Sequence, residues 1–139
     1  MSNKVTHIVN CCGREATNKW GNVGIIYLTL NWKDIDSQVI YNPKLQSFDK
    51  VFSFIDSTLQ KGSSVLAHSI RGQSRSGCVI VAYLMQKYYW TLDKALQFLR
   101  FRRSNIKIRS SFLRQLRDFE EELKKKAELS NNWLGRLVL

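Results

Sequence analysis

One segment in the middle of the chain, residues 68–76, combines residue types that bind an oxyanion. It has the sequence His-Ser-Ile-Arg-Gly-Gln-Ser-Arg-Ser. A short loop before a helix N-terminus points successive backbone N–H groups inward, and Gly72 permits torsions that other residues resist. Arg75 can fold back over these amides, because a guanidinium makes two parallel charge-assisted bonds to phosphate or sulfate. The segment predicts a phosphate-binding loop with contacts from Ile70, Arg71, Gly72, Gln73, Ser74 and Arg75.

The elements around this loop are predicted from hydrophobic periodicity. Apolar runs at residues 5–11, 24–30 and 64–68 indicate buried strands. Apolar residues at helical spacing predict four helices. The first follows Asn42 and Pro43, which predict its start; the second covers residues 77–87; the third follows Thr91 as its N-cap; and the fourth covers residues 112–123. Strands alternating with helices predict an α/β fold with a central, largely parallel sheet and helices on both faces. The loop would then lie at a strand's carboxyl end, where such sheets bind ligands.

Composition sets the class of protein. With 139 residues, 44% of them hydrophobic, the chain can form one domain without metals, cofactors or disulfides; we expect that domain at residues 1–128 and a tail at 129–139. Three cysteines favour a reducing compartment, and the longest apolar runs are too short to span a bilayer. A cytoplasmic or nuclear protein that does not bind membranes is therefore expected. The net charge of +11 favours anionic partners.

The loop resembles that of the cysteine-dependent protein-tyrosine phosphatases. Their signature is His-Cys, five residues, Arg, then Ser or Thr, and this chain has His68-Ser69, five residues, then Arg75-Ser76. The surroundings resemble the dual-specificity subgroup at Val65-Leu66-Ala67-His68, Ala82-Tyr83-Leu84-Met85, Thr91-Leu92-Asp93-Lys94-Ala95 and Phe112-Leu113-Arg114-Gln115-Leu116. The resemblance implies a protein-tyrosine-phosphatase-like fold lacking the family's usual N-terminal strand and helix. If the chain is shortened there, a strand edge and an apolar patch should be exposed.

The resemblance also implies roles for single residues. Ser69 stands at the position of the nucleophilic cysteine, and Asp34 aligns best with the general acid, with Asp36 as the second candidate. His68 would help to orient the loop, or would simply be a buried histidine bonded to nearby backbone. Ser76 would help to expel the nucleophile, or would be an N-cap.

Serine at the nucleophile position changes the expected chemistry. A thiol can ionise in such a loop, whereas an alcohol stays protonated without a general base, and adjacent strand residues such as His68 and Ser69 point to opposite faces. The other cysteines, Cys11, Cys12 and Cys78, have no arginine at the required spacing. We therefore expect phosphate binding with little or no hydrolysis. Two explanations fit: a natural pseudophosphatase, favoured by the departure from the family pattern at residues 106–109, or a Cys-to-Ser trapping form of an active enzyme.

The expected partner is a protein carrying phosphotyrosine, phosphoserine or phosphothreonine. A rival interpretation rests on the basic stretch at residues 100–126, which could dock acidic proteins, acidic filaments or nucleic acid. The alternative is a solvated helix face, since Glu120–Glu122 precede Lys124–Lys126 at pairing distance. No basic motif interleaved with aromatic residues supports nucleic acid. The sequence does not specify an oligomeric state.

Overall fold

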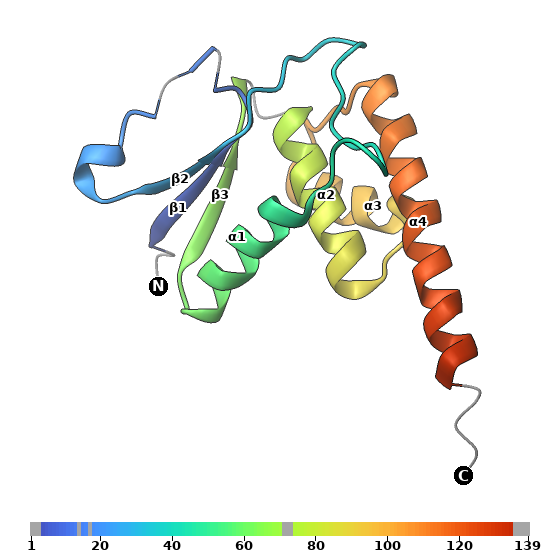
Figure 1. Cartoon of the computed structure of the whole chain (residues 1–139). Helices are drawn as coiled ribbons and strands as arrows, with labels where there is room; N and C mark the ends of the chain where they lie inside the picture. Colours follow the sequence, from blue (N-terminus) through green and yellow to red (C-terminus); the bar gives the residue numbers. More distant parts are fainter. Residues whose placement is uncertain (1–3, 14, 17, 71–73, 135–139) are drawn as a thin grey trace.

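The protein is described by a computed structural model that covers residues 4–13, 15–16, 18–70 and 74–134. Figure 1 shows a small sheet with a layer of helices beside it. The strands are β1 (Val5–Asn10), β2 (Ile26–Thr29) and β3 (Ser64–His68). The helices are the short 3-10 helix η1 (Gly21–Val23), α1 (Asp49–Gln60), α2 (Arg75–Tyr88), α3 (Leu92–Arg102) and α4 (Ser110–Leu134).

The three strands form one parallel sheet in the order β2-β1-β3. Ile8 of β1 lies between Tyr27 of β2 and Leu66 of β3, and Asn10 pairs with His68. These findings confirm the predicted α/β class and the parallel sheet. Because the strands are parallel, their carboxyl ends meet at one edge, and the segments that follow β1, β2 and β3 come together there.

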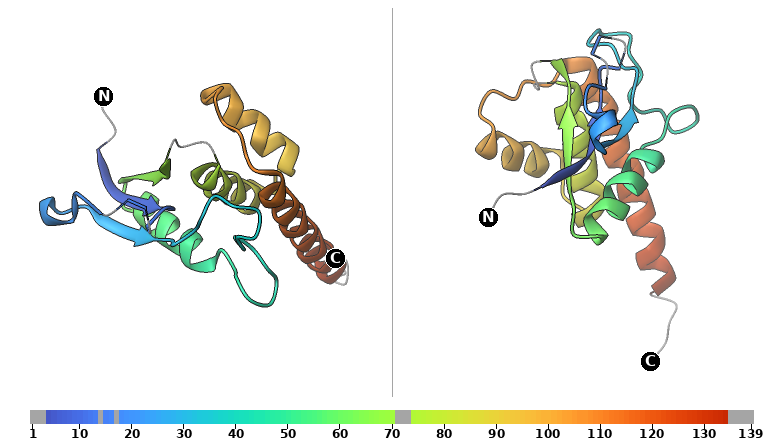
Figure 2. Two further views of the ribbon diagram at one scale, coloured as in Figure 1. Left: turned by 90° about the horizontal axis from the view of Figure 1, so that it is seen from above. Right: turned by 90° about the vertical axis from the view of Figure 1, so that its left-hand side faces the viewer.

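The helices of the described residues lie on one face of the sheet. The α-helices lie to the right of the sheet in Figure 1 and behind it in the right-hand view of Figure 2. α1 and α2 contact β3, and α3 and α4 pack against α2. Val9 joins the core on this face, and Val65 and Ala67 pack against it. The expectation of helices on both faces is therefore wrong for the part of the chain that the structure describes.

No α-helix of the described residues covers the opposite face of the sheet, which we call the open face. Ile8, Tyr27 and Leu66 line a cavity of about 360 Å³ there, and the Leu66 side chain is exposed. β3 is an edge strand of the described sheet, since it pairs with β1 alone. The described sheet therefore has an edge strand and, on this face, a cavity lined in part by apolar side chains.

The start of α1 differs from the prediction. α1 begins at Asp49, whereas Asn42 forms a tight turn in which its side-chain oxygen accepts bonds from the Lys44 and Leu45 amides. Gln46 closes this turn by pairing with Asn42 in an isolated bridge. Leu45 consequently lies at the surface, 83% exposed. The asparagine side chain competes with the helix for these backbone donors.

The later helices follow the prediction more closely. The Thr91 hydroxyl accepts a bond from the Lys94 amide at 3.1 Å, which confirms Thr91 as the N-cap of α3. α4 carries Phe112, Leu116 and Phe119 into the core and continues as far as Leu134. Within the described residues, no helix combines the length and apolar character needed to cross a membrane.

Candidate phosphate-binding site

Ser69 leaves the carboxyl end of β3 and meets the first turn of α2. Its hydroxyl is buried and donates to Ser76 Oγ at 2.9 Å, while the Ser76 amide donates to Ser69 Oγ at 3.2 Å. Ser76 is therefore a partner of Ser69 inside α2, and the prediction of Ser76 as an N-cap is wrong. The N-cap position belongs to Ser74, whose side chain makes no capping bond and instead accepts from the Arg109 amide at 3.1 Å.

Arg75 is the most tightly held charged residue of the site. Its side chain is 3% exposed, and Nη1 donates to Glu15 Oε1 at 2.8 Å and to the Trp32 carbonyl at 3.0 Å. Nη2 donates to Glu15 Oε2 at 3.4 Å. The Glu15 carboxylate and the Trp32 carbonyl thus bind the terminal edge of the guanidinium, which is the edge formed by Nη1 and Nη2. The Nε–H and the second Nη2–H have no acceptor among the described residues, and they form the side edge that can bind an oxyanion in a bidentate manner.

Glu15 reaches Arg75 because the end of β1 fixes the following turn. Asn10 is buried, donates its amide to the Ala16 carbonyl at 3.0 Å and accepts from the Cys12 amide at 3.0 Å. The Glu15 amide closes the turn by donating to the Cys12 carbonyl at 2.9 Å. Neither Glu15 nor the Trp32 carbonyl was identified from the sequence. No local pattern marks a glutamate that meets an arginine 60 positions later.

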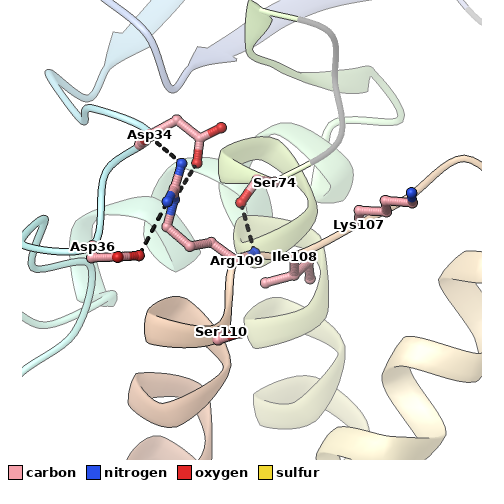
Figure 3. A pocket seen from close by; sticks show the side chains of 7 residues that line it. All are labelled: Asp34, Asp36, Ser74, Lys107, Ile108, Arg109 and Ser110. Carbon is pink, nitrogen blue, oxygen red and sulfur yellow. Dashed lines mark hydrogen bonds and ion pairs between the residues drawn. The ribbon is translucent and has the colours of Figure 1, made fainter.

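The two candidate acids, Asp34 and Asp36, lie on the loop after β2 and face Arg109 at the start of α4. Figure 3 shows Arg109 between them. Its Nε donates to Asp34 Oδ1 at 2.9 Å, and its Nη1 donates to Asp36 Oδ1 at 3.1 Å. The hydrogen bond to Asp34 is the largest cause that raises the pKa of the Arg109 guanidinium, and the bond to Asp36 is the next. The guanidinium therefore stays cationic. Sequence analysis marked residues 106–109 only as a departure from the family pattern and missed this role of Arg109.

A cavity of about 360 Å³ lies beside this ion-pair cluster. Its lining consists of Asp34, Asp36, Ser74, Lys107, Ile108, Arg109 and Ser110 (Figure 3). Ser74 belongs to both the cavity wall and the end of the phosphate loop. The loop after β2, the phosphate loop and the start of α4 are therefore joined through one buried serine and one arginine.

The remaining predicted site residues are partly described. Ile70 is exposed, and Arg71, Gly72 and Gln73 lie outside the described residues. The His68 side chain lines the cavity on the open face of the sheet, away from the Ser69 hydroxyl, and its carbonyl accepts from the Cys11 amide at 2.7 Å. His68 and Ser69 thus point to different sides, as strand alternation predicts.

The cysteine side chains are unsuited to act as nucleophiles. Cys11, Cys12 and Cys78 are free and buried. Burial raises the pKa of the Cys11 and Cys78 thiols, so both are neutral near pH 7. Within the described ranges, no group of three or more His, Cys, Asp or Glu side chains is arranged to hold a metal ion.

A parallel sheet in which β3 leads through the Ser69–Arg75 loop into α2 is the arrangement of a protein-tyrosine-phosphatase-type domain. Comparison with known families agrees, because the model of the dual specificity phosphatase catalytic domain matches residues 1–122. The chain belongs to the dual-specificity phosphatase family.

Relatives and solved structures support this assignment. The chain is 34% identical over 121 residues to a protein phosphatase Slingshot homolog of Xenopus laevis, covering 86% of the chain and 16% of that protein. It is 38% identical to the tyrosine-protein phosphatase yvh1 of Schizosaccharomyces pombe, covering 79% of the chain and 33% of that protein. The chain thus spans less than half of the length of these curated relatives.

Two human crystal structures illustrate the shared fold. The tyrosine phosphatase-like serine/threonine/tyrosine-interacting protein superposes with a TM-score of 0.74 at 29% identity, over 86% of this chain and 78% of that chain. DUSP28 superposes with a TM-score of 0.70 at 27% identity, over 86% of this chain and 77% of that chain. The sheet and helices described above are those of this structural class.

Proposed function

We propose that this chain recognises phosphorylated proteins through its phosphate loop and hydrolyses phosphate poorly or not at all. The observation that carries the proposal is the state of Arg75, a buried guanidinium whose end is fixed and whose side edge has no acceptor among the described residues. Glu15 and the Trp32 carbonyl hold the group in place before any ligand arrives. Such preorganisation reduces the entropy lost when an oxyanion binds.

The environment of Ser69 supports the lack of turnover. In the family signature this position carries cysteine, which attacks as a thiolate. Ser69 instead offers a hydroxyl that donates its proton to Ser76, and His68 lies on the other side of the strand. No described group is placed to remove the proton from Ser69. An alcohol without a general base is a weak nucleophile, so attack on phosphorus is not favoured.

The position of Asp34 also supports a lack of turnover, because the leaving oxygen needs a general acid. A general acid must carry a proton and approach the leaving oxygen. Asp34 is engaged with the cationic Arg109 through both its carboxylate and its backbone carbonyl. To approach a leaving oxygen, Asp34 would have to give up these contacts with Arg109.

The natural partner proposed here is a phosphotyrosine-, phosphoserine- or phosphothreonine-bearing protein of the cytoplasm or nucleus. One similar human protein is itself described as phosphatase-like and as interacting with serine, threonine or tyrosine. A Cys-to-Ser form of an active phosphatase would bind phosphate in the same way.

The decisive experiment combines binding and turnover. Wild-type protein should bind a phosphotyrosine peptide and fail to hydrolyse p-nitrophenyl phosphate. Arg75→Ala should weaken peptide binding by about 10- to 100-fold, because it removes two hydrogen bonds to a charged group. The unphosphorylated peptide serves as the ligand control, and Ser69→Ala serves as a variant that should still bind.

Ser69→Cys tests whether the missing thiol alone accounts for inactivity. Turnover by Ser69→Cys would show that catalysis is absent at one atom, for lack of a thiolate. Continued inactivity would show that other parts of the site have also departed from a catalytic arrangement. Robust hydrolysis by the serine form, or equal binding by Arg75→Ala, would refute the proposal.

A further inference from the structure

A second surface, remote in sequence from the phosphate loop, exposes large aromatic side chains. Phe101 is 92% exposed and Tyr89 is 71% exposed, and Tyr88 and Phe98 are exposed as well. They lie at the end of α2 and along the outer face of α3. Phenylalanine is normally among the most buried residue types, and contiguous exposed apolar groups mark interaction sites.

These rings form a continuous row with cations between them. The Tyr88 and Trp90 ring centroids are 5.3 Å apart, and Trp90 and Phe98 are also 5.3 Å apart. Lys94 Nζ lies 4.7 Å from the Trp90 centroid, and the Arg102 guanidinium carbon lies 4.6 Å from that of Phe98. We call this surface the aromatic–basic ridge; it comprises Tyr88, Trp90, Lys94, Phe98, Phe101 and Arg102.

Helical spacing explains why the ridge is separate from the core. Positions 94, 98 and 102 lie four residues apart and share one side of α3. The opposite side of α3 is buried and consists of Leu92, Ala95, Leu96 and Leu99. α3 is therefore anchored by its aliphatic face and presents the ridge outward.

The ridge is also strongly positive. α3 carries Lys94, Arg100 and Arg102, and Arg103 follows at its C-cap. Asp93 is the one acidic residue of α3, and its carboxylate lies 3.9 Å from Arg117 of α4. A ligand approaching the ridge therefore meets cations beside exposed rings. Such a surface is complementary to a segment that alternates carboxylates with apolar side chains.

We propose that the aromatic–basic ridge binds an acidic protein segment bearing apolar or aromatic side chains. Its carboxylates would pair with Lys94 and Arg102, which their cation–π contacts already hold over the rings. Its apolar side chains would pack on Phe101 and the open faces of the neighbouring rings.

Two other occupants fit the ridge less well. A second copy of this chain would bring like charges together, since the net charge is +11 and the ridge itself is basic. Single-stranded nucleic acid stacks its bases on open aromatic faces. Here Lys94 covers a face of Trp90 and Arg102 covers a face of Phe98, so the rings in the middle of the row are poor stacking platforms.

The test uses defined probes on the full chain. A fluorescein-labelled peptide alternating Glu with Leu and Phe is titrated by anisotropy, and amide shifts in NMR spectra locate its site. The same peptide with Gln for Glu, polyglutamate and oligo-dT are the comparison ligands. The Glu-containing apolar peptide should bind tightest and shift the amides of the ridge.

Matched variants assign the binding to the ridge. Phe101→Ala and Lys94→Glu should each weaken binding about tenfold. Leu45→Ala removes an equally exposed apolar side chain and Lys50→Glu reverses an exposed charge on α1, so both should bind normally. Arg75→Ala should leave this binding unchanged, which separates it from phosphate recognition. Equal binding of the Gln peptide, tighter binding of oligo-dT, or no effect of Phe101→Ala would overturn the proposal.

Discussion

The contact between Glu15 and Arg75 makes a quantitative prediction about stability. Glu15→Gln keeps the size of the side chain and an acceptor but removes its charge, leaving the buried guanidinium uncompensated. Removing a partner from a fully buried pair costs about 3–5 kcal/mol, whereas exposed pairs contribute about 0–1 kcal/mol. Because Arg75 is 3% exposed and Glu15 is 40% exposed, we expect a value between these limits, about 1–3 kcal/mol.

Urea denaturation measures this loss. With a slope of about 2 kcal/mol per molar urea, the unfolding midpoint of Glu15→Gln should fall by about 0.5–1.5 M. Arg75→Met supplies the matched background for a double-mutant cycle, since Glu15 should contribute little to folding once the guanidinium is absent. A coupling energy below about 0.5 kcal/mol would refute the reasoning. Inorganic phosphate should stabilise Glu15→Gln more than wild type, because the anion then supplies the missing negative charge.

Three further predictions address other parts of the domain. Arg109→Ala should change the free energy of unfolding little because its ion pairs are exposed, yet it should speed hydrogen exchange of the loop that carries Asp34. Thr91→Ala should lower the free energy of unfolding by about 0.5–2 kcal/mol in urea titrations, and Thr91→Ser should restore it. Burial raises the pKa of the Cys11 and Cys78 thiols above the ordinary 9.0, so the folded state retains protons that the unfolded chain loses. The free energy of unfolding should therefore keep the contribution of these thiols below about pH 9 and decrease above it. Cys78→Ala should make the decrease with pH shallower, and an unchanged slope would contradict this.

Local patterns predicted the elements that deliver the phosphate loop. β3, the loop and α2 follow directly from an apolar run, a Gly/Ser-rich segment and helical spacing, all within a short stretch of chain. The positions of Ser69 and Arg75 follow from this order. The start of α1 could not be predicted in the same way, because Asn42 is a good N-cap and also a good turn former. Which of these wins depends on the backbone closure at Gln46, a contact that periodicity does not report.

The long-range contacts of the site could not be predicted from the sequence. Glu15 and Arg109 contact partners that lie 60 and 75 residues away along the chain, and neither belongs to a motif. Both are surface-type residues whose default interpretation is solvation. The ridge was hidden for a related reason: Phe98 and Leu99 are neighbours of similar hydrophobicity, but only the rotation of α3 decides which is buried.

The contacts around Ser69 and Arg75 suggest how a domain of this kind could lose turnover and keep phosphate binding. Arg75 is fixed by Glu15 and the Trp32 carbonyl, contacts that do not involve the Ser69 side chain. Ser69 is held by Ser76, a contact that does not involve the guanidinium. On the proposed function, a hydroxyl in place of a thiol would remove the attacking group without disturbing the guanidinium proposed to hold phosphate. A domain built in this way could bind phosphate without being a catalyst, since recognition and attack would depend on different side chains of one loop.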